Sequence, residues 1–227
     1  MVILINKNEE NVKEIFRRIS TKYDLMDSIM SFGMDTYWRK KLIENLKLKD
    51  GQDILDVGCG SGKISYSIEN TINANHIYAM DITREMFPFK NSSKVQFMEG
   101  SAMNIPIKDE GVDRVVSGFL TRNVPSLETY LVEVYRVLKP GGIFCNLDIF
   151  DPQKNLIAPL FRLYFYRIVP ILFDKISGTH SYSYLARSVQ SFVSPSFVHN
   201  LLLKTGFSKV TIRRMAGGTV YIHTAIK

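Results

Sequence analysis

A glycine-rich loop directly after a short apolar segment is the feature that most limits how this chain can fold. Residues 53–57 are typical of a buried β-strand, and residues 56–62 read Asp-Val-Gly-Cys-Gly-Ser-Gly ahead of a helix predicted over residues 61–69. Glycine lets the backbone approach a ligand closely, and the following helix presents free N–H groups to an anionic group. This order predicts an α/β fold with a ligand site after the first strand.

Spacing separates the glycine loops that can follow a strand. A dinucleotide loop reads G-x-G-x-x-G, whereas this loop reads G-x-G-x-G with Asp56 two residues before Gly58. A phosphate loop would have glycine in place of Val57 and serine or threonine in place of Ile64. Asp81 ends a second predicted strand, 81 − 56 = 25 residues beyond Asp56, which suits a carboxylate that binds two ribose hydroxyls. Its alternative role is an acid at a helix N-terminus, and the neighbouring loop favours the ribose role.

The rest of the chain alternates predicted strands and helices, which is typical of a parallel sheet. Strands are predicted over residues 76–80, 95–99, 112–117 and 143–149, and helices over residues 83–90, 126–138 and 195–205. Helical periodicity also covers residues 11–46, with a break near residues 31–33, and an amphipathic section covers residues 155–192. Strands over residues 208–215 and 219–226 should form a terminal hairpin.

These elements predict a Rossmann-like, doubly wound α/β fold. Its sheet should have seven strands, mostly parallel, with an antiparallel C-terminal hairpin. We expect a single domain over residues 1–227, with an N-terminal helical cap at residues 1–48 and a lid insertion at residues 151–194.

Composition restricts the class of protein more than its partner. The net charge of +7 is compatible with acidic lipid, nucleic acid or an anionic metabolite, and equally with a solvated basic surface. Two cysteines and four histidines lack the spacing of a disulfide framework or a metal site, so we expect no metal and a reducing, cytoplasmic location. The start of the chain lacks the pattern of a signal peptide.

The longest mainly apolar stretch, residues 156–173, is interrupted by arginines and prolines and is a poor candidate for a membrane-spanning helix. The basic, aromatic residues 155–175 suit either a helical lid buried on the sheet or contact with acidic lipid, which would place the protein peripherally on the inner membrane face.

Four motifs resemble the class I S-adenosylmethionine-dependent methyltransferases, namely residues 56–62, Asp81, residues 101–102 and residues 136–142. The resemblance implies S-adenosyl-L-methionine as cofactor, with Asp81 on its ribose and Ile82 and Ala102 beside its adenine. Ser101 stands where members usually have Asp or Asn to meet the adenine amino group. The residues implied to hold the methionine part are Asp56, Gly58, Cys59, Gly60 and Gly62.

A narrower resemblance, to the ubiquinone and menaquinone biosynthesis C-methyltransferases, spans nearly the whole chain. Its segments are residues 23–33 with Trp38, and residues 118–124, 181–188 and 216–220. It implies methylation of a polyprenylated hydroquinone, a lipophilic small molecule, with no nucleic-acid partner and with a homodimer left open. The chain departs from the family pattern, which usually has Asn at Asp27, His at Asp35, an acid at Lys63, Glu at Asp148 and Ser at Phe150.

Carbon methylation needs a ring carbon made nucleophilic by loss of a hydroxyl proton, held in line with the methyl group, and a later acceptor for the ring proton. Arg122 and Asn123 follow the fourth strand, where they would stabilise and orient a hydroquinone anion rather than bind the cofactor; surface polarity is their alternative role. Asp148 is the first candidate proton acceptor and His180 the second. Tyr23, Tyr182 and Tyr184, with His180, are expected to wall the substrate pocket.

Three functions stay open on sequence alone. The first is C-methylation of a quinol ring, and the second is methylation of another small-molecule acceptor. The third is binding of S-adenosylmethionine without catalysis.

Overall fold

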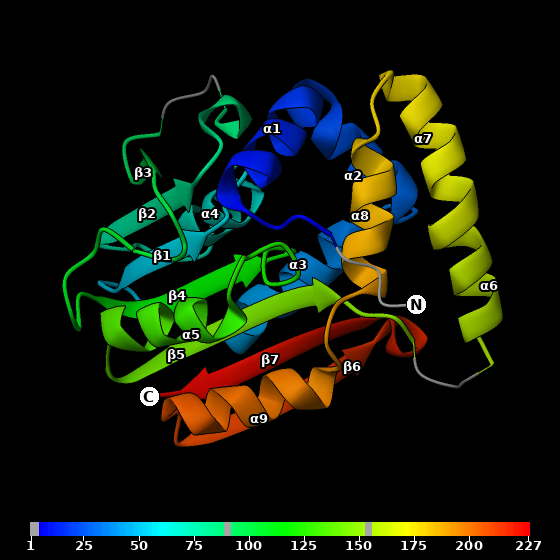
Figure 1. Ribbon diagram of the computed structural model, residues 1–227. Helices are drawn as coiled ribbons and strands as arrows, with labels where there is room; N and C mark the ends of the chain where they lie inside the picture. The colour runs from blue at the N-terminus through cyan, green and yellow to red at the C-terminus, as the bar shows by residue number, and fades with distance from the viewer. Residues whose placement is uncertain (1–4, 89–91, 153–155) are drawn as a thin grey trace.

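The computed structural model describes residues 5–88, 92–152 and 156–227. A seven-stranded sheet forms its centre, in the order β3-β2-β1-β4-β5-β7-β6 (Figure 1). The strands are β1 Asp53–Val57, β2 His76–Asp81, β3 Val95–Glu99, β4 Val112–Gly118, β5 Leu138–Ile149, β6 Lys209–Met215 and β7 Val220–Ile226. The first five pair in parallel, and β7 pairs antiparallel with both β5 and β6. The predicted doubly wound sheet and terminal hairpin are therefore confirmed.

Helices cover both faces of the sheet, as the continuous apolar strands require. On one face α5 Leu127–Val137 and α9 Pro195–Thr205 pack through a core that includes Tyr130 and Leu202. On the other face α3 Met34–Asn45 and α4 Lys63–Glu69 pack through a core that includes Leu42 and Ile68. The carboxyl ends of the parallel strands form the edge at which sheets of this kind bind ligands.

The first helices of the chain lie over this edge (Figure 1). They are α1 Glu9–Ile19, a 3-10 turn Ser20–Lys22 and α2 Tyr23–Met30, which lead into α3. The side chain of Asn8 caps α1 by accepting a hydrogen bond from the N–H of Asn11. Gly33, with φ of 74°, makes the turn between α2 and α3, so the predicted break at residues 31–33 is confirmed.

A second helical group follows β5 and lies beside the first. It consists of α6 Ala158–Leu163, a π-helical turn Tyr164–Ile168, α7 Val169–Ser177 and α8 Ser181–Gln190. A third core joins it to α1 and α2 through side chains such as Val12, Met26, Val169 and Val189. The cap and the lid therefore support one another across the edge of the sheet, while the assignment of residues 1–227 to a single domain stays a prediction.

The helix predicted over residues 83–90 was wrong over its described part, where only a 3-10 turn forms at Arg84–Met86. Pro88 disfavours helical backbone at the residue before it, and Phe87 is extended, with φ −64° and ψ 143°. Residues 89–90 lie outside the described residues, as do residues 1–4 of the predicted cap and residues 153–155 of the predicted lid. Across the described ranges, no helix is both long enough and apolar enough to cross a membrane.

Candidate active site

The loop between β1 and α4 is held against the end of β2 by its own backbone. Gly58, Gly60 and Gly62 all have positive φ, at 71°, 53° and 79°. The N–H groups of Gly58 and Cys59 donate to the carbonyl of Met80 at 2.8 and 3.0 Å. A Cβ at Gly62 would lie 2.7 Å from Cζ of Phe97, so glycine is needed there for space as well as for conformation.

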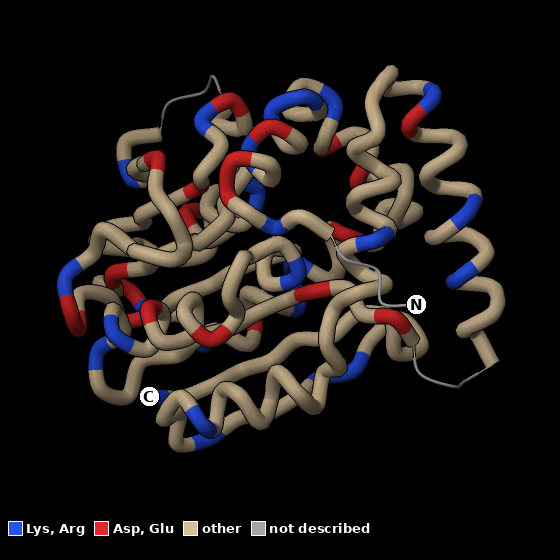
Figure 2. Tube along the Cα trace, in the orientation of Figure 1, with Lys and Arg blue, Asp and Glu red and all other residues tan. Residues whose placement is uncertain are grey.

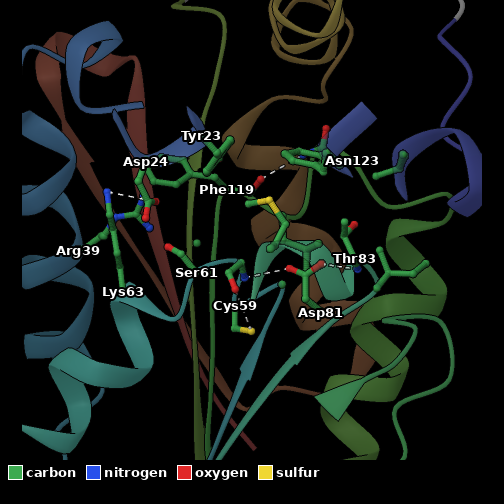
Figure 3. Close-up of a pocket in the computed structure, with 18 residues that line it drawn as sticks. Tyr23, Asp24, Arg39, Cys59, Ser61, Lys63, Asp81, Thr83, Phe119 and Asn123 are labelled. Carbon is green, nitrogen blue, oxygen red and sulfur yellow. Dashed lines mark hydrogen bonds and ion pairs between the residues drawn. The ribbon is translucent and has the colours of Figure 1, made fainter. Parts of the chain in front are cut away.

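Asp81 organises the floor of this site. Its Oδ2 accepts a hydrogen bond from the N–H of Gly60 at 2.9 Å, and its Oδ1 accepts one from the N–H of Thr83 at 2.8 Å (Figure 3). Burial raises the pKa of the Asp81 carboxyl, and these backbone N–H groups oppose that shift. A carboxylate oxygen can accept more than one hydrogen bond, as binding of a ribose diol requires.

Two small hollows along this loop share Gly58, Asp81, Ile82 and Asn123 and together make one groove. Their volumes are about 70 and 50 Å³, and Ala102 lines the second. Asn123 lines both hollows, and its buried Oδ1 is an acceptor with no hydrogen-bond partner within the described structure. Positive-φ glycines, a paired carboxylate and this acceptor fit a ligand with ribose and amino groups.

Three further residues predicted to bind the cofactor are buried or are bonded within the protein. Asp56 is fully buried behind the loop, where Oδ2 accepts a hydrogen bond from Ser65 Oγ at 2.6 Å, and burial raises its pKa to about 7. The Cys59 thiol is buried along the groove, and burial raises its pKa. Ser101 donates to Glu9 and accepts from the N–H of Met103, so its hydroxyl acts inside the protein.

A larger cavity of about 240 Å³ lies next to the groove. Its wall is mostly apolar and comes from the cap, the lid and the loop after β4. Tyr23 and Phe119 line both this cavity and the groove, so the two spaces meet at these rings. Asp27 and Arg122 are the charged side chains among the described residues of its wall. An apolar acceptor here would lie directly beside a ligand in the groove.

Phe119 is held in a strained backbone conformation at this junction, with φ of 64°. Its carbonyl accepts hydrogen bonds from Arg122 Nη1 at 2.8 Å and from Asn123 Nδ2 at 3.2 Å. The guanidinium groups of Arg39 and Arg122 lie 4.9 and 5.8 Å from its ring centre. The loop after β4 therefore positions an aromatic wall between the two spaces.

Arg122 and Asp148 form a buried ion pair, with Nη1 and Oδ1 2.5 Å apart. Oδ1 of Asp148 also accepts the N–H of Ile149, and Oδ2 accepts Thr121 Oγ1 at 2.6 Å and the N–H of Arg122 at 3.0 Å. Both oxygens are occupied and the residue has no exposed surface. This placement does not agree with the predicted role of Asp148 as proton acceptor.

The other residues predicted for the acceptor site lie in different parts of the structure. Arg122 lines the larger cavity, whereas Asn123 lines the groove and not that cavity, contrary to the expectation that both face the acceptor. His180 precedes α8 as its N-cap residue; its side chain is 97% exposed and lines neither space. Tyr182 and Tyr184 are buried in the core between cap and lid, and α8 instead presents Leu185 to the cavity. Tyr23 lies where it was expected.

An ionic cluster beside the cofactor groove was missed from the sequence. Lys63 Nζ lies 3.3 Å from Asp24 (Figure 3). It also lies 3.5 Å from Asp35, and Arg39 Nη2 lies 2.6 Å from Asp27. The i, i+4 spacing of Asp35 and Arg39 on one helix could have signalled part of it. Two of the family departures, Asp35 and Lys63, are here partners in an ion pair.

Comparison with known proteins agrees with this geometry. Residues 4–227 match the ubiE/COQ5 methyltransferase family. The demethylmenaquinone methyltransferases of Staphylococcus haemolyticus and Staphylococcus saprophyticus are 31% and 32% identical, over 98% and 96% of this chain and 96% and 97% of theirs. A crystal structure of a SAM-dependent methyltransferase from Aquifex aeolicus shares the fold, with a TM-score of 0.60 and 18% identity over 83% of this chain and 88% of that one.

The strand order, the glycine loop with Asp81 and the full-length family match all agree with the resemblance stated from the sequence. The chain belongs to the ubiE/COQ5 methyltransferase family and is an S-adenosylmethionine-dependent methyltransferase.

Proposed function

We propose that the protein methylates a ring carbon of a prenylated hydroquinone of the demethylmenaquinol type. The observation that carries the proposal is the apolar cavity that meets the cofactor groove at Tyr23 and Phe119. Relatives named demethylmenaquinone methyltransferase, similar over nearly the whole chain, support the same acceptor class. A cavity with this wall suits a flat aromatic ring better than a polar amine or nucleic-acid base.

Bound S-adenosylmethionine supplies a methyl group already activated by its positive sulfur. The chain then has to bind and orient both ligands and to stabilise the ring anion. Asp81 would accept hydrogen bonds from the ribose, and the predicted contacts of Asp56, Gly58, Gly60 and Gly62 with the methionine part stay part of the proposal. We further propose that Asn123 binds the cofactor rather than the acceptor, through its Oδ1, which has no hydrogen-bond partner among the described residues.

Arg122 is proposed to stabilise the acceptor's phenolate. It lines the cavity, and its buried Nε has no hydrogen-bond partner within the described residues. The ion pair with Asp148 fixes the guanidinium, because four hydrogen-bond donors surround that carboxylate. Asp148 is thus a positioning residue in this proposal, and its carboxylate is not the base.

The acceptor's prenyl chain is proposed to reach a lipid surface. Exposed apolar side chains lie on the cap and lid helices, where the ring centre of Phe32 in the α2–α3 turn is 5.4 Å from that of Tyr164 of the lid. Basic residues accompany them along the segment from α6 to α7, at Arg162, Arg167 and Lys175 (Figure 2). Apolar residues flanked by cations favour an anionic bilayer. The exposed apolar residues are Leu25, Ile29, Phe32, Met34, Leu160, Leu163, Ile168, Ile171, Leu172 and Ile176.

Co-sedimentation with vesicles that contain anionic lipid tests the surface. Ile171→Asp should reduce binding several-fold without changing cofactor affinity, because Ile171 is 73% exposed and apolar. Val132→Asp on α5 is the matched control, since Val132 is also exposed but lies outside the surface. A dimer in solution that Ile171→Asp dissociates would assign the surface to a second copy of the chain instead.

Cellular quinones test the function itself. Removing the protein should replace the methylated quinone by its demethyl form, and Asp81→Ala should fail to restore it. An unchanged quinone pool would refute the proposal, and accumulation of another unmethylated metabolite would identify a different small-molecule acceptor.

A further inference from the structure

Asp27 is unlike the other buried acids of the site. Its side chain is 13% exposed, and it lines the acceptor cavity from α2, one helical turn after Tyr23. Tyr23 lies at the junction of the cavity and the groove. A carboxylate one turn from that junction is within the space that an acceptor ring and its hydroxyls would fill.

The two oxygens of Asp27 have different surroundings. Oδ2 accepts a hydrogen bond from Arg39 Nη2 at 2.6 Å. Oδ1 has no hydrogen-bond donor among the residues that the structure describes. Arg39 is held in turn by an ion pair with Asp35, in which Nε and Oδ2 are 3.6 Å apart, and by the contact of its guanidinium with the ring of Phe119. Asp27 is therefore an oriented carboxylate with one free oxygen, whereas both oxygens of Asp148 are occupied.

Resting on the proposed function, we infer that Asp27 is the general base that removes the hydroxyl proton of the acceptor. The O–H bond breaks, its proton passes to Oδ1 of Asp27, and the electron pair enters the ring. The new carbon–carbon bond then forms as the methyl–sulfur bond breaks, with that bond's electrons left on sulfur. The ring C–H proton leaves to water, and the ring oxygen recovers the proton from Asp27, so one proton is released per methyl transferred.

The charges around Asp27 suit this role. Burial raises the pKa of its carboxyl and the Arg39 guanidinium opposes the rise, so the carboxylate is a stronger base than that of a solvent-exposed aspartate. Phenolate formed in the cavity would face Arg122. The other titratable or charged groups that act on Asp27 or respond to it are Tyr23, Asp35, Lys63, Arg122 and Tyr182.

The test is the pH dependence of methyl transfer by the full chain to a prenylated demethylnaphthohydroquinone. Asp27→Asn keeps the shape and removes the charge, so kcat should fall by about 10²-fold or more while the acceptor KM and cofactor affinity change little. The acidic limb of the wild-type profile should vanish. The difference in kcat between the wild type and Asp27→Asn should shrink toward about pH 10, where the phenolic hydroxyl of the acceptor ionises without a base. Glu44→Gln is the control, because Glu44 also pairs with a cation on the cap but lies outside both spaces.

Wild-type activity separates the two proposals. If the wild type binds cofactor but transfers no methyl to this acceptor, the proposed function fails. If the wild type is active and Asp27→Asn keeps its kcat and acidic limb, only the base assignment fails. Should Asp27→Asn not fold, Asp27→Ala with added formate replaces it, because a small carboxylate in the vacated space should restore turnover and no restoration would overturn the inference.

Discussion

Truncation of Arg122 should cost stability as well as activity. Arg122→Ala leaves Asp148 without its cation at a position with no exposed surface. Removing one partner of a buried ion pair destabilises a protein by about 3–5 kcal/mol. At about 2–4 °C per kcal/mol for a chain of this size, the melting temperature should fall by roughly 6–20 °C. Urea and thermal unfolding of the purified variant measure both quantities.

Arg162→Ala is the control for this prediction. Arg162 also pairs with an aspartate, Asp151 at 2.9 Å, but half of its side chain is exposed. Such a pair should contribute only about 0–1 kcal/mol. Arg122→Lys keeps the charge but removes the Nη1 group that donates to both Asp148 and the carbonyl of Phe119, so its cost should lie between the other two. A loss below about 1 kcal/mol in Arg122→Ala would show that the pair does not hold the loop after β4.

Three further changes test the cofactor groove. Asp81→Ala should weaken S-adenosylmethionine binding by about 10²-fold or more in calorimetry, because two hydrogen bonds to a charged group contribute about 1.5–3 kcal/mol each; unchanged affinity would contradict the ribose role. Gly62→Ala should disrupt binding and stability through its contact with Phe97, whereas Gly141→Ala, also at positive φ but with open space, should cost only about 1–2 kcal/mol. Burial raises the pKa of Asp56 to about 7, so between about pH 4 and 7 the folded chain holds a proton that the unfolded chain has lost. The free energy of unfolding should therefore fall as pH rises through this window. An equally steep fall in the Asp56→Asn variant would refute this.

The strands, the glycine loop and the terminal hairpin could be predicted because each follows from local pattern. The strands predicted over residues 53–57 and 95–99 and the helix predicted over residues 195–205 have the bounds seen in the structure. Asp81 could be placed because parallel strands end at one edge of a sheet. These features need only the sequence near them.

The acceptor side depends on long-range packing and was predicted less well. His180 and Tyr184 were judged by residue type, but the direction of a side chain on α8 is set by contacts with α1 and α7. Asp148 was assigned as a base because it ends β5, and only the folded loop brings Arg122 to it. The role inferred for Asp27 required the cavity wall and the anchor from Arg39, which no local pattern contains.

The most direct measurement is methyl transfer from labelled S-adenosylmethionine to a prenylated demethylnaphthohydroquinone by the purified protein, under reducing conditions. Our account predicts a product with one added methyl on a ring carbon, formed by the wild type and absent with Asp81→Ala. Cofactor binding without any product, or a methyl attached to oxygen, would contradict it.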